Sequence, residues 1–201
     1  MPITRFRHAV LFNSHLEHPS SGVILGRMRI VFDLLMRIQK RRQLPLLLIG
    51  GWAVQAHGYA RNTLDVDCLV AIENDPVMAE ELTKAGFECF EEKPSFRRFR
   101  HRIDPLIVLD VMRVNAATFE KMWAGSASVT LSGVELRVPA LAHLIALKLH
   151  AAQNEHRVEK DLADVIALLR GNLGEIPAAE LRKLCDQFGT PALAERLADF
   201  L

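Results

Sequence analysis

The spacing of apolar residues changes twice along the chain, and each change predicts a different kind of structure. Between 22 and 42 apolar residues recur every three or four positions, as on one face of a helix. Short apolar or alternating runs then predict strands, at 44–49, 64–72, 87–91, 96–103 and 106–114. From 140 onward helical spacing returns, near 140–152, 157–170, 177–188 and 191–200.

Turn residues connect these segments. Gly50 and Gly51 break the first strand before WAVQAHG, a short predicted helix, and a further helix is expected to end near Ala85 because Gly86 follows it. The run VTLSGVELRV predicts a β-hairpin that turns at Ser132 and Gly133. The pattern therefore predicts an α+β fold: a mixed β-sheet with flanking helices over 1–138 and a helical subdomain over 139–201, continuous with one another.

Composition places this fold in an ordinary folded protein. The 201 residues are 50% hydrophobic and carry a net charge of +1, so charge alone gives no case for nucleic acid. Cys68, Cys89 and Cys185 are widely separated, which argues against a disulfide framework and a cysteine zinc site. The apolar parts of MPITRFRHAVLF and LPLLLIGGWAV are too short for a secretory signal or a bilayer span. We therefore expect a cytoplasmic protein with no membrane partner.

Two carboxylates share one face of the strand at 64–72. Side chains alternate along a strand, so Asp65 and Asp67 point the same way, roughly 7 Å apart. The opposite face is apolar, with Leu64, Val66, Cys68 and Val70. The acidic face itself turns apolar at Leu69 and Ala71, so the pair is expected where a packed face opens.

A third carboxylate lies in an apolar strand, LIVLDVMRV. Asp110 there needs a cation, a hydrogen-bond network or a raised pKa. Convergence of Asp65, Asp67 and Asp110 from neighbouring strands would make an oxygen site suited to Mg²⁺ and phosphate chemistry. The alternative is that Asp65 and Asp67 form an exposed strand face and Asp110 pairs with an arginine.

The glycine turn adds a second element of a phosphate site. Gly50 and Gly51 allow close backbone approach and present N–H groups and the positive end of a helix to an anion. Many Gly-Gly turns serve packing only, so the combination with the acids is what favours a nucleotide site.

These residues resemble a known family. GGWAVQAHGYARNTLDVDCLV is similar to the active-site signature of the nucleotidyltransferase toxin group typified by AbiEii, within the polymerase-β-like superfamily. The resemblance implies that Gly50 and Gly51 open the nucleotide site and that Asp65, Asp67 and Asp110 hold a two-ion Mg²⁺ site. Gly51 departs from the superfamily pattern, in which many members carry serine there. Arg61 and Thr63 match the family's Arg-x-Thr-x-Asp-x-Asp pattern and could orient phosphate, although structural pairing explains Arg61 equally well.

The resemblance spans roughly 45–170. In its helical part the resemblance implies that Lys148 and Asp161 are a functional pair. Lys148 would bind the triphosphate or stabilise the negative charge that develops during the reaction. The alternative is a helix-face lysine paired with a carboxylate. The family reaction would be in-line transfer of a nucleoside monophosphate from an NTP to a hydroxyl of RNA, including tRNA, or of a protein, with a cognate antitoxin as partner.

Other features are less specific. Arg98, Arg100 and Arg102 predict a basic strand face that could contact RNA or serve as a solvated edge that discourages aggregation. His57 is expected to act as a structural hydrogen-bonding group, and His143, His150 and His156 lack zinc-site spacing. Two further functions stay open: a non-catalytic nucleotide- or partner-binding module of the same fold, and a metal nuclease that needs no NTP.

Overall fold

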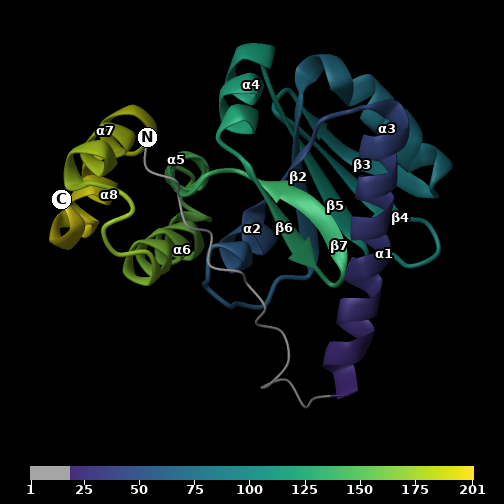
Figure 1. Cartoon of the computed structure of the whole chain (residues 1–201), viewed down its shortest axis with the longest axis horizontal. Helices are drawn as coiled ribbons and strands as arrows, with labels where there is room; N and C mark the ends of the chain where they lie inside the picture. The colour runs from purple at the N-terminus through teal and green to yellow at the C-terminus, as the bar shows by residue number, and fades with distance from the viewer. Residues whose placement is uncertain (1–18) are drawn as a thin grey trace.

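A five-stranded mixed sheet forms the centre of the computed structural model, which describes residues 19–201 (Figure 1). Its order is β1-β2-β5-β4-β3, and β2 and β5 are parallel while the other neighbours are antiparallel. The strands are β1 (Leu47–Ile49), β2 (Asp65–Ala71), β3 (Phe87–Lys93), β4 (Phe96–His101) and β5 (Val108–Val114). The predicted α+β class and mixed sheet are confirmed, whereas the N-terminal segment at 1–18 lies outside the described residues.

One face of the sheet packs on α1 (Pro19–Arg42) and α3 (Asp75–Lys84), which follows the 3₁₀ turn η1 (Ile72–Asn74). The largest buried side chain of α1 is Phe32, whose ring meets Trp52 of α2 (Gly50–Ala56) edge-on at 5.0 Å. Because strand side chains alternate, the apolar set of β2 that joins this core is Val66, Cys68 and Val70. Leu64, predicted on the same face, precedes β2 and is 62% exposed, so that prediction is wrong.

The predicted hairpin is present as β6 (Ala127–Leu131) and β7 (Val134–Val138). Ser132 (φ 49°) and Gly133 (φ 80°) take the positive φ angles that a two-residue hairpin turn needs.

The other face of the sheet is covered by α4 (Ala116–Ala124), a helix that the sequence pattern did not reveal. Asn115 caps it by accepting a hydrogen bond from the Thr118 N–H at 2.8 Å. Phe119 and Met122 from this helix pack on Leu69 and other apolar side chains of the acid-bearing sheet face. The Asn115 cap and the i, i+3 spacing of Phe119 and Met122 could have predicted this helix, but the apolar pattern spans few residues.

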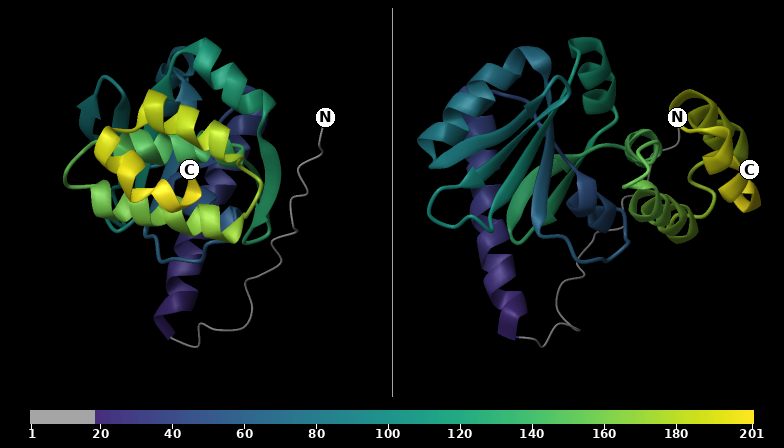
Figure 2. Two further views of the ribbon diagram at one scale, coloured as in Figure 1. Left: turned by 90° about the vertical axis from the view of Figure 1, so that its left-hand side faces the viewer. Right: turned by 180° about the vertical axis from the view of Figure 1, so that it is seen from behind.

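The C-terminal helices gather at one end of the molecule (Figure 2). They are α5 (Leu141–Ala151), α6 (Val158–Gly171), α7 (Ala178–Phe188), α8 (Pro191–Arg196) and the 3₁₀ turn η2 (Ala198–Phe200). The last predicted helix is therefore shorter, and it breaks at Leu197. The division at 138/139 stays a prediction. Within residues 19–201, no helix combines the length and the apolar character that crossing a bilayer requires.

Candidate active site

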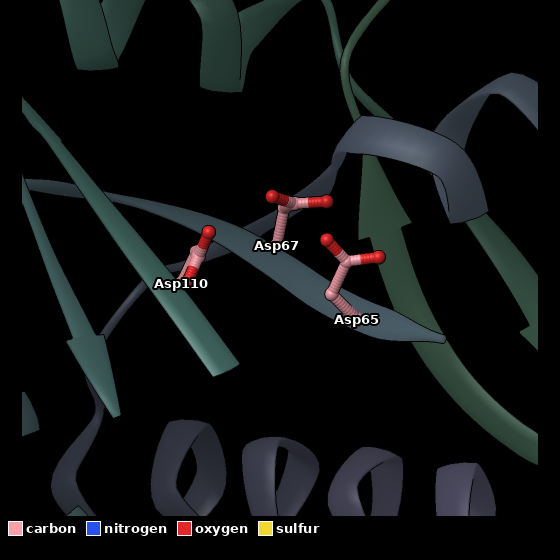
Figure 3. Close-up of side chains that lie close together, drawn as sticks. All are labelled: Asp65, Asp67 and Asp110. Carbon is pink, nitrogen blue, oxygen red and sulfur yellow. The ribbon is translucent and has the colours of Figure 1, made fainter. Parts of the chain in front are cut away.

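The three predicted carboxylates lie together on one face of the sheet (Figure 3). Asp67 of β2 is the direct register partner of Asp110 on the parallel strand β5. Asp65 stands two residues before Asp67 and therefore shares its face. One oxygen from each carboxylate can be chosen so that all three lie within 4.8 Å of one another.

The acids mark the edge of an apolar patch. Leu69 and Ala71, which follow on the same face, are buried against Leu47 of β1 and against Phe119 of α4. The predicted change from acidic to apolar along this face is thus confirmed. Each carboxylate side chain keeps partial exposure, so a ligand can approach it.

Burial and the neighbouring like charges change the titration of Asp67. Its burial, together with Asp65 and Asp110 beside it, raises the pKa of Asp67 to about 6, although Lys148 and Arg157 oppose the shift. A carboxylate with a raised pKa gains most from a bound cation, because the cation removes the repulsion that the ionised form suffers.

Asp110 has a cationic partner as well. Arg98 Nε on β4 donates to Asp110 Oδ1 at 3.0 Å, across the register pair that joins the two residues. Burial raises the pKa of Asp110, and the Arg98 guanidinium offsets only part of this increase. The predicted alternative, in which Asp110 pairs with an arginine, is therefore present together with the three-acid cluster.

The glycine turn lies directly against the acids. Gly50 has φ +62°, and a Cβ atom there would lie 1.9 Å from Asp67 Oδ2. A Cβ atom on Gly51 would lie 2.6 Å from Thr63 Oγ1 and 2.9 Å from Arg61 Nη2. Glycine at 51, where many superfamily members carry serine, is thus explained by the Thr63 side chain, which fills the space.

Asp65 is fixed from two sides. Thr63 Oγ1 donates to Asp65 Oδ1 at 3.2 Å, and Trp52 Nε1 donates to the Asp65 carbonyl oxygen at 3.1 Å. Thr63 therefore orients a carboxylate in this structure. The proposed contact of Thr63 with phosphate stays a prediction.

Lys148 and Asp161 form the predicted pair. Lys148 Nζ lies 2.8 Å from Asp161 Oδ1 and 2.7 Å from Asp164 Oδ2, and all three side chains are buried. Burial works to raise the pKa of Asp161, but Lys148 and Arg157 outweigh it and hold that pKa below its usual value. Asp164 also pairs with Arg61 at 2.8 Å, which supports the structural pairing considered for Arg61.

Asp164 and Arg157 are site residues that were not predicted from the sequence. The signal for Asp164 was its i, i+3 spacing from Asp161 on a helix whose remaining inward positions are apolar. Arg157 lies in the loop just before α6, where the sequence pattern gives no side-chain direction.

The basic strand face is only partly present. β4 ends at His101, so Arg102 lies beyond it. Arg100 pairs with Glu88 at 2.7 Å, and Phe90 lies 5.5 Å from both Arg98 and Arg100. As predicted, His57 forms a hydrogen-bonding contact, through Nε2 to the Pro139 carbonyl at 2.9 Å.

The site suits a hard divalent cation. Three carboxylate oxygens within 4.8 Å supply the ligand type that Mg²⁺ prefers, and Gly50 has no side chain that would collide with Asp67. Asp65, Asp67 and Asp110 would hold the ion.

Comparison with known proteins identifies the fold. No protein-family model matches the sequence, and no curated protein matches it. The antibiotic-resistance factor ANT(2'')-Ia has a similar structure, with a TM-score of 0.61 at 18% identity over 85% of this chain and 95% of that chain. The lincosamide antibiotic adenylyltransferase LnuA gives 0.53 at 16% identity over 73% and 97% of the two chains.

A third solved structure agrees. An antigenic nucleotidyltransferase-like protein from Paracoccidioides brasiliensis gives a TM-score of 0.50 at 14% identity over 86% of this chain and 93% of that chain. Similarity at these identities carries information about the fold. The chain therefore has the polymerase-β-like nucleotidyltransferase fold.

Proposed function

We propose that the chain is a Mg²⁺-dependent nucleotidyltransferase of the AbiEii-like toxin group. In this reaction it transfers a nucleoside monophosphate from an NTP to a hydroxyl of RNA, including tRNA, or of a protein. The observation that carries the proposal is the register pair Asp67–Asp110 with Asp65 beside it, set against the Gly50 turn in this fold. Solved structures of the same fold include an adenylyltransferase and a complex with adenylyl-2''-tobramycin.

The position of each residue suggests its role in the transfer reaction. The acceptor oxygen forms a bond to the α-phosphorus, the bond from that phosphorus to the bridging oxygen breaks, and pyrophosphate leaves. By analogy with the family that the sequence resembles, Asp110 would assist deprotonation of the acceptor, and Arg98 holds its Oδ1. Thr63 and Trp52 keep Asp65 oriented. Bound Mg²⁺ would neutralise phosphate charge and stabilise the attacking and leaving oxygens.

Labelled-nucleotide transfer tests the proposal. The purified chain is incubated with Mg²⁺ and each labelled NTP, in separate arms with total RNA, a protein extract, an aminoglycoside and a lincosamide. We expect the wild-type chain to label the RNA or the protein arm. The variants Asp65→Ala and Asp67→Ala should give no label. The control Asp199→Ala, which alters an exposed acid in η2, should label as wild type does. Label confined to an antibiotic arm would retain nucleotidyl transfer and reject the proposed acceptor.

Two further outcomes would contradict parts of the proposal. Transfer that survives Asp65→Ala and Asp67→Ala rejects the assignment of the carboxylates. Absence of transfer together with absence of Mg²⁺-dependent NTP binding in calorimetry favours a non-catalytic binding module. The toxin-like role predicts that expression of the wild-type chain, but not of Asp67→Ala, arrests growth of the host cell and that a cognate antitoxin relieves the arrest.

A further inference from the structure

Five charged side chains form a continuous chain of ion pairs between the glycine turn and the C-terminal helices. In order along the network they are Arg61, Asp164, Lys148, Asp161 and Arg157, with successive N–O distances of 2.8, 2.7, 2.8 and 2.8 Å. Three cations meet two carboxylates, so the network carries one surplus positive charge. Its location decides which residue can attract an anion.

Lys148 is not available to a ligand in this structure. Its side chain is 5% exposed, and its ammonium is held between two buried carboxylates. A phosphate that reached Lys148 would have to displace Asp161 or Asp164, each of which would then be buried without its lysine partner. Arg61 is similarly covered, with 16% of its side chain exposed.

Arg157 is the cation of the network that faces solvent. Its side chain is 54% exposed, and Nε is the atom that bonds Asp161. Among residues 19–201, its two terminal nitrogens take part in no hydrogen bond. The guanidinium also lies within electrostatic reach of the acids, since it opposes the raised pKa values of Asp67 and Asp110.

We infer that Arg157 binds the triphosphate of the NTP, whereas Lys148 is a buried ion-pair partner of Asp161 and Asp164 and does not contact the phosphates. This inference rests on the proposed function and assigns the phosphate contact to Arg157, which the family signature did not indicate. A guanidinium anchored through Nε still presents two terminal N–H₂ groups, which match two phosphate oxygens. The three carboxylates would hold the cation on one side of the triphosphate. Arg157 would bind the triphosphate from the other side, where the C-terminal helices lie.

Calorimetry with the full chain and Mg²⁺ tests this assignment without turnover. Each of the four NTPs and the four corresponding NMPs is titrated, and the ratio of their dissociation constants measures recognition of the two outer phosphates. Arg157→Ala is expected to weaken NTP binding by about tenfold to a hundredfold and NMP binding by less than about threefold. Arg157→Lys should recover part of the loss, because the lysine ammonium keeps the positive charge but lacks the paired N–H donors of the guanidinium.

Arg170→Ala is the matched control, since it removes an exposed arginine from the last turn of α6, the helix that follows Arg157. It should leave the NTP-to-NMP ratio unchanged. If Arg157→Ala also keeps the wild-type ratio, Arg157 does not bind the triphosphate. A wild-type chain that binds NMP and NTP equally overturns the inference alone, because labelled-nucleotide transfer tests the proposed function separately.

A second variant distinguishes a structural ion-pair role of Lys148 from direct contact with the phosphates. Lys148→Met combined with Asp164→Asn removes the lysine while leaving the Asp161–Arg157 pair, and thermal denaturation establishes that it is folded. This double variant should keep the NTP-to-NMP ratio within about threefold of wild type, because Arg157 stays anchored. Loss of the ratio in the folded double variant, with retention in Arg157→Ala, would assign the triphosphate contact to Lys148 instead.

Discussion

Gly50 and Asp67 occupy adjoining volumes, since a Cβ atom on Gly50 would lie 1.9 Å from Asp67 Oδ2. Gly50 also has φ +62°, where L side chains are strained. Gly50→Ala is therefore expected to lower the free energy of unfolding by about 2–4 kcal/mol and to abolish nucleotidyl transfer. Gly133→Ala is the control for strain alone, because Gly133 has φ +80° with open space around it. Equal losses of stability in the two variants would contradict the predicted clash with Asp67.

Gly51 and Thr63 compete for one volume, so their substitutions should not be additive. Gly51→Ser alone places atoms 2.6 Å from Thr63 Oγ1 and 2.7 Å from Thr63 Cβ and should destabilise the fold. Thr63→Gly removes both of these atoms. Urea denaturation of the single and double variants should therefore give a favourable coupling free energy of about 1–3 kcal/mol. Additive losses would show that Thr63 is not what excludes a side chain at 51.

Asp67 should make stability depend on pH. Its pKa is raised from 3.8 to about 6 in the folded chain, so the folded state holds this proton more tightly than the unfolded state does. The associated stability is present below the unfolded pKa and is lost as pH rises through about 6. Asp67→Asn is thus expected to be more stable than wild type at pH 8, by up to about 3 kcal/mol, and equal to it near pH 4.

Chemical denaturation across this pH range checks the prediction, with Asp199→Asn as the control. Saturating Mg²⁺ should stabilise wild type and reduce the advantage of Asp67→Asn, since the variant lacks one of the three carboxylates. An advantage of Asp67→Asn that stays constant from pH 4 to pH 8 would contradict the assigned titration.

The three carboxylates were predictable because strand periodicity and parallel pairing are local, regular properties. Asp65 and Asp67 share a face by alternation, and the apolar strand around Asp110 indicated a buried neighbour of β2. Arg98 was not predictable as the partner of Asp110, because the pairing depends on the register between β4 and β5. The register was not encoded in either strand alone.

The charged network was predictable only in part. The Lys148–Asp161 pair came from the family signature, and the structure contains that contact. Asp164 had only a weak signal, its i, i+3 spacing from Asp161, and its partner Lys148 follows from the packing of α5 on α6. The pairing of Arg157 with Asp161 depends on the conformation of the loop before α6. The helix α4 was missed for a related reason: nine residues give too few turns for a clear apolar period.

The buried pairs of Lys148 should make it important for stability. Lys148→Met leaves Asp161 and Asp164 buried with less compensation, so the free energy of unfolding should fall by about 3–5 kcal/mol. Adding Asp164→Asn should recover part of this loss, since one uncompensated charge is removed. Arg196→Ala, which breaks an exposed pair with Glu159 at 2.7 Å, should lower the free energy of unfolding far less than Lys148→Met does. Urea denaturation that gives similar losses for Lys148→Met and Arg196→Ala would contradict the energetic role of burial.

Arg98 should weaken binding of divalent cations at the acid cluster. Its guanidinium lies 3.0 Å from Asp110 Oδ1, so it occupies one oxygen of a proposed ligand and repels an incoming cation. The same guanidinium lowers the pKa of Asp110 and so favours its ionised form, which would help metal binding. At pH 8 we expect the repulsion to have the larger effect. Arg98→Gln keeps a hydrogen-bond donor and removes the charge. It is therefore expected to tighten Mn²⁺ binding at pH 8 by about threefold to tenfold, the effect of a half-exposed charge pair.

Calorimetric titration with Mn²⁺ measures this change in affinity, and Arg100→Gln, whose partner is Glu88, is the matched control on the same strand. Weaker Mn²⁺ binding in Arg98→Gln alone would instead mean that Arg98 is needed to hold Asp110 in a ligating orientation.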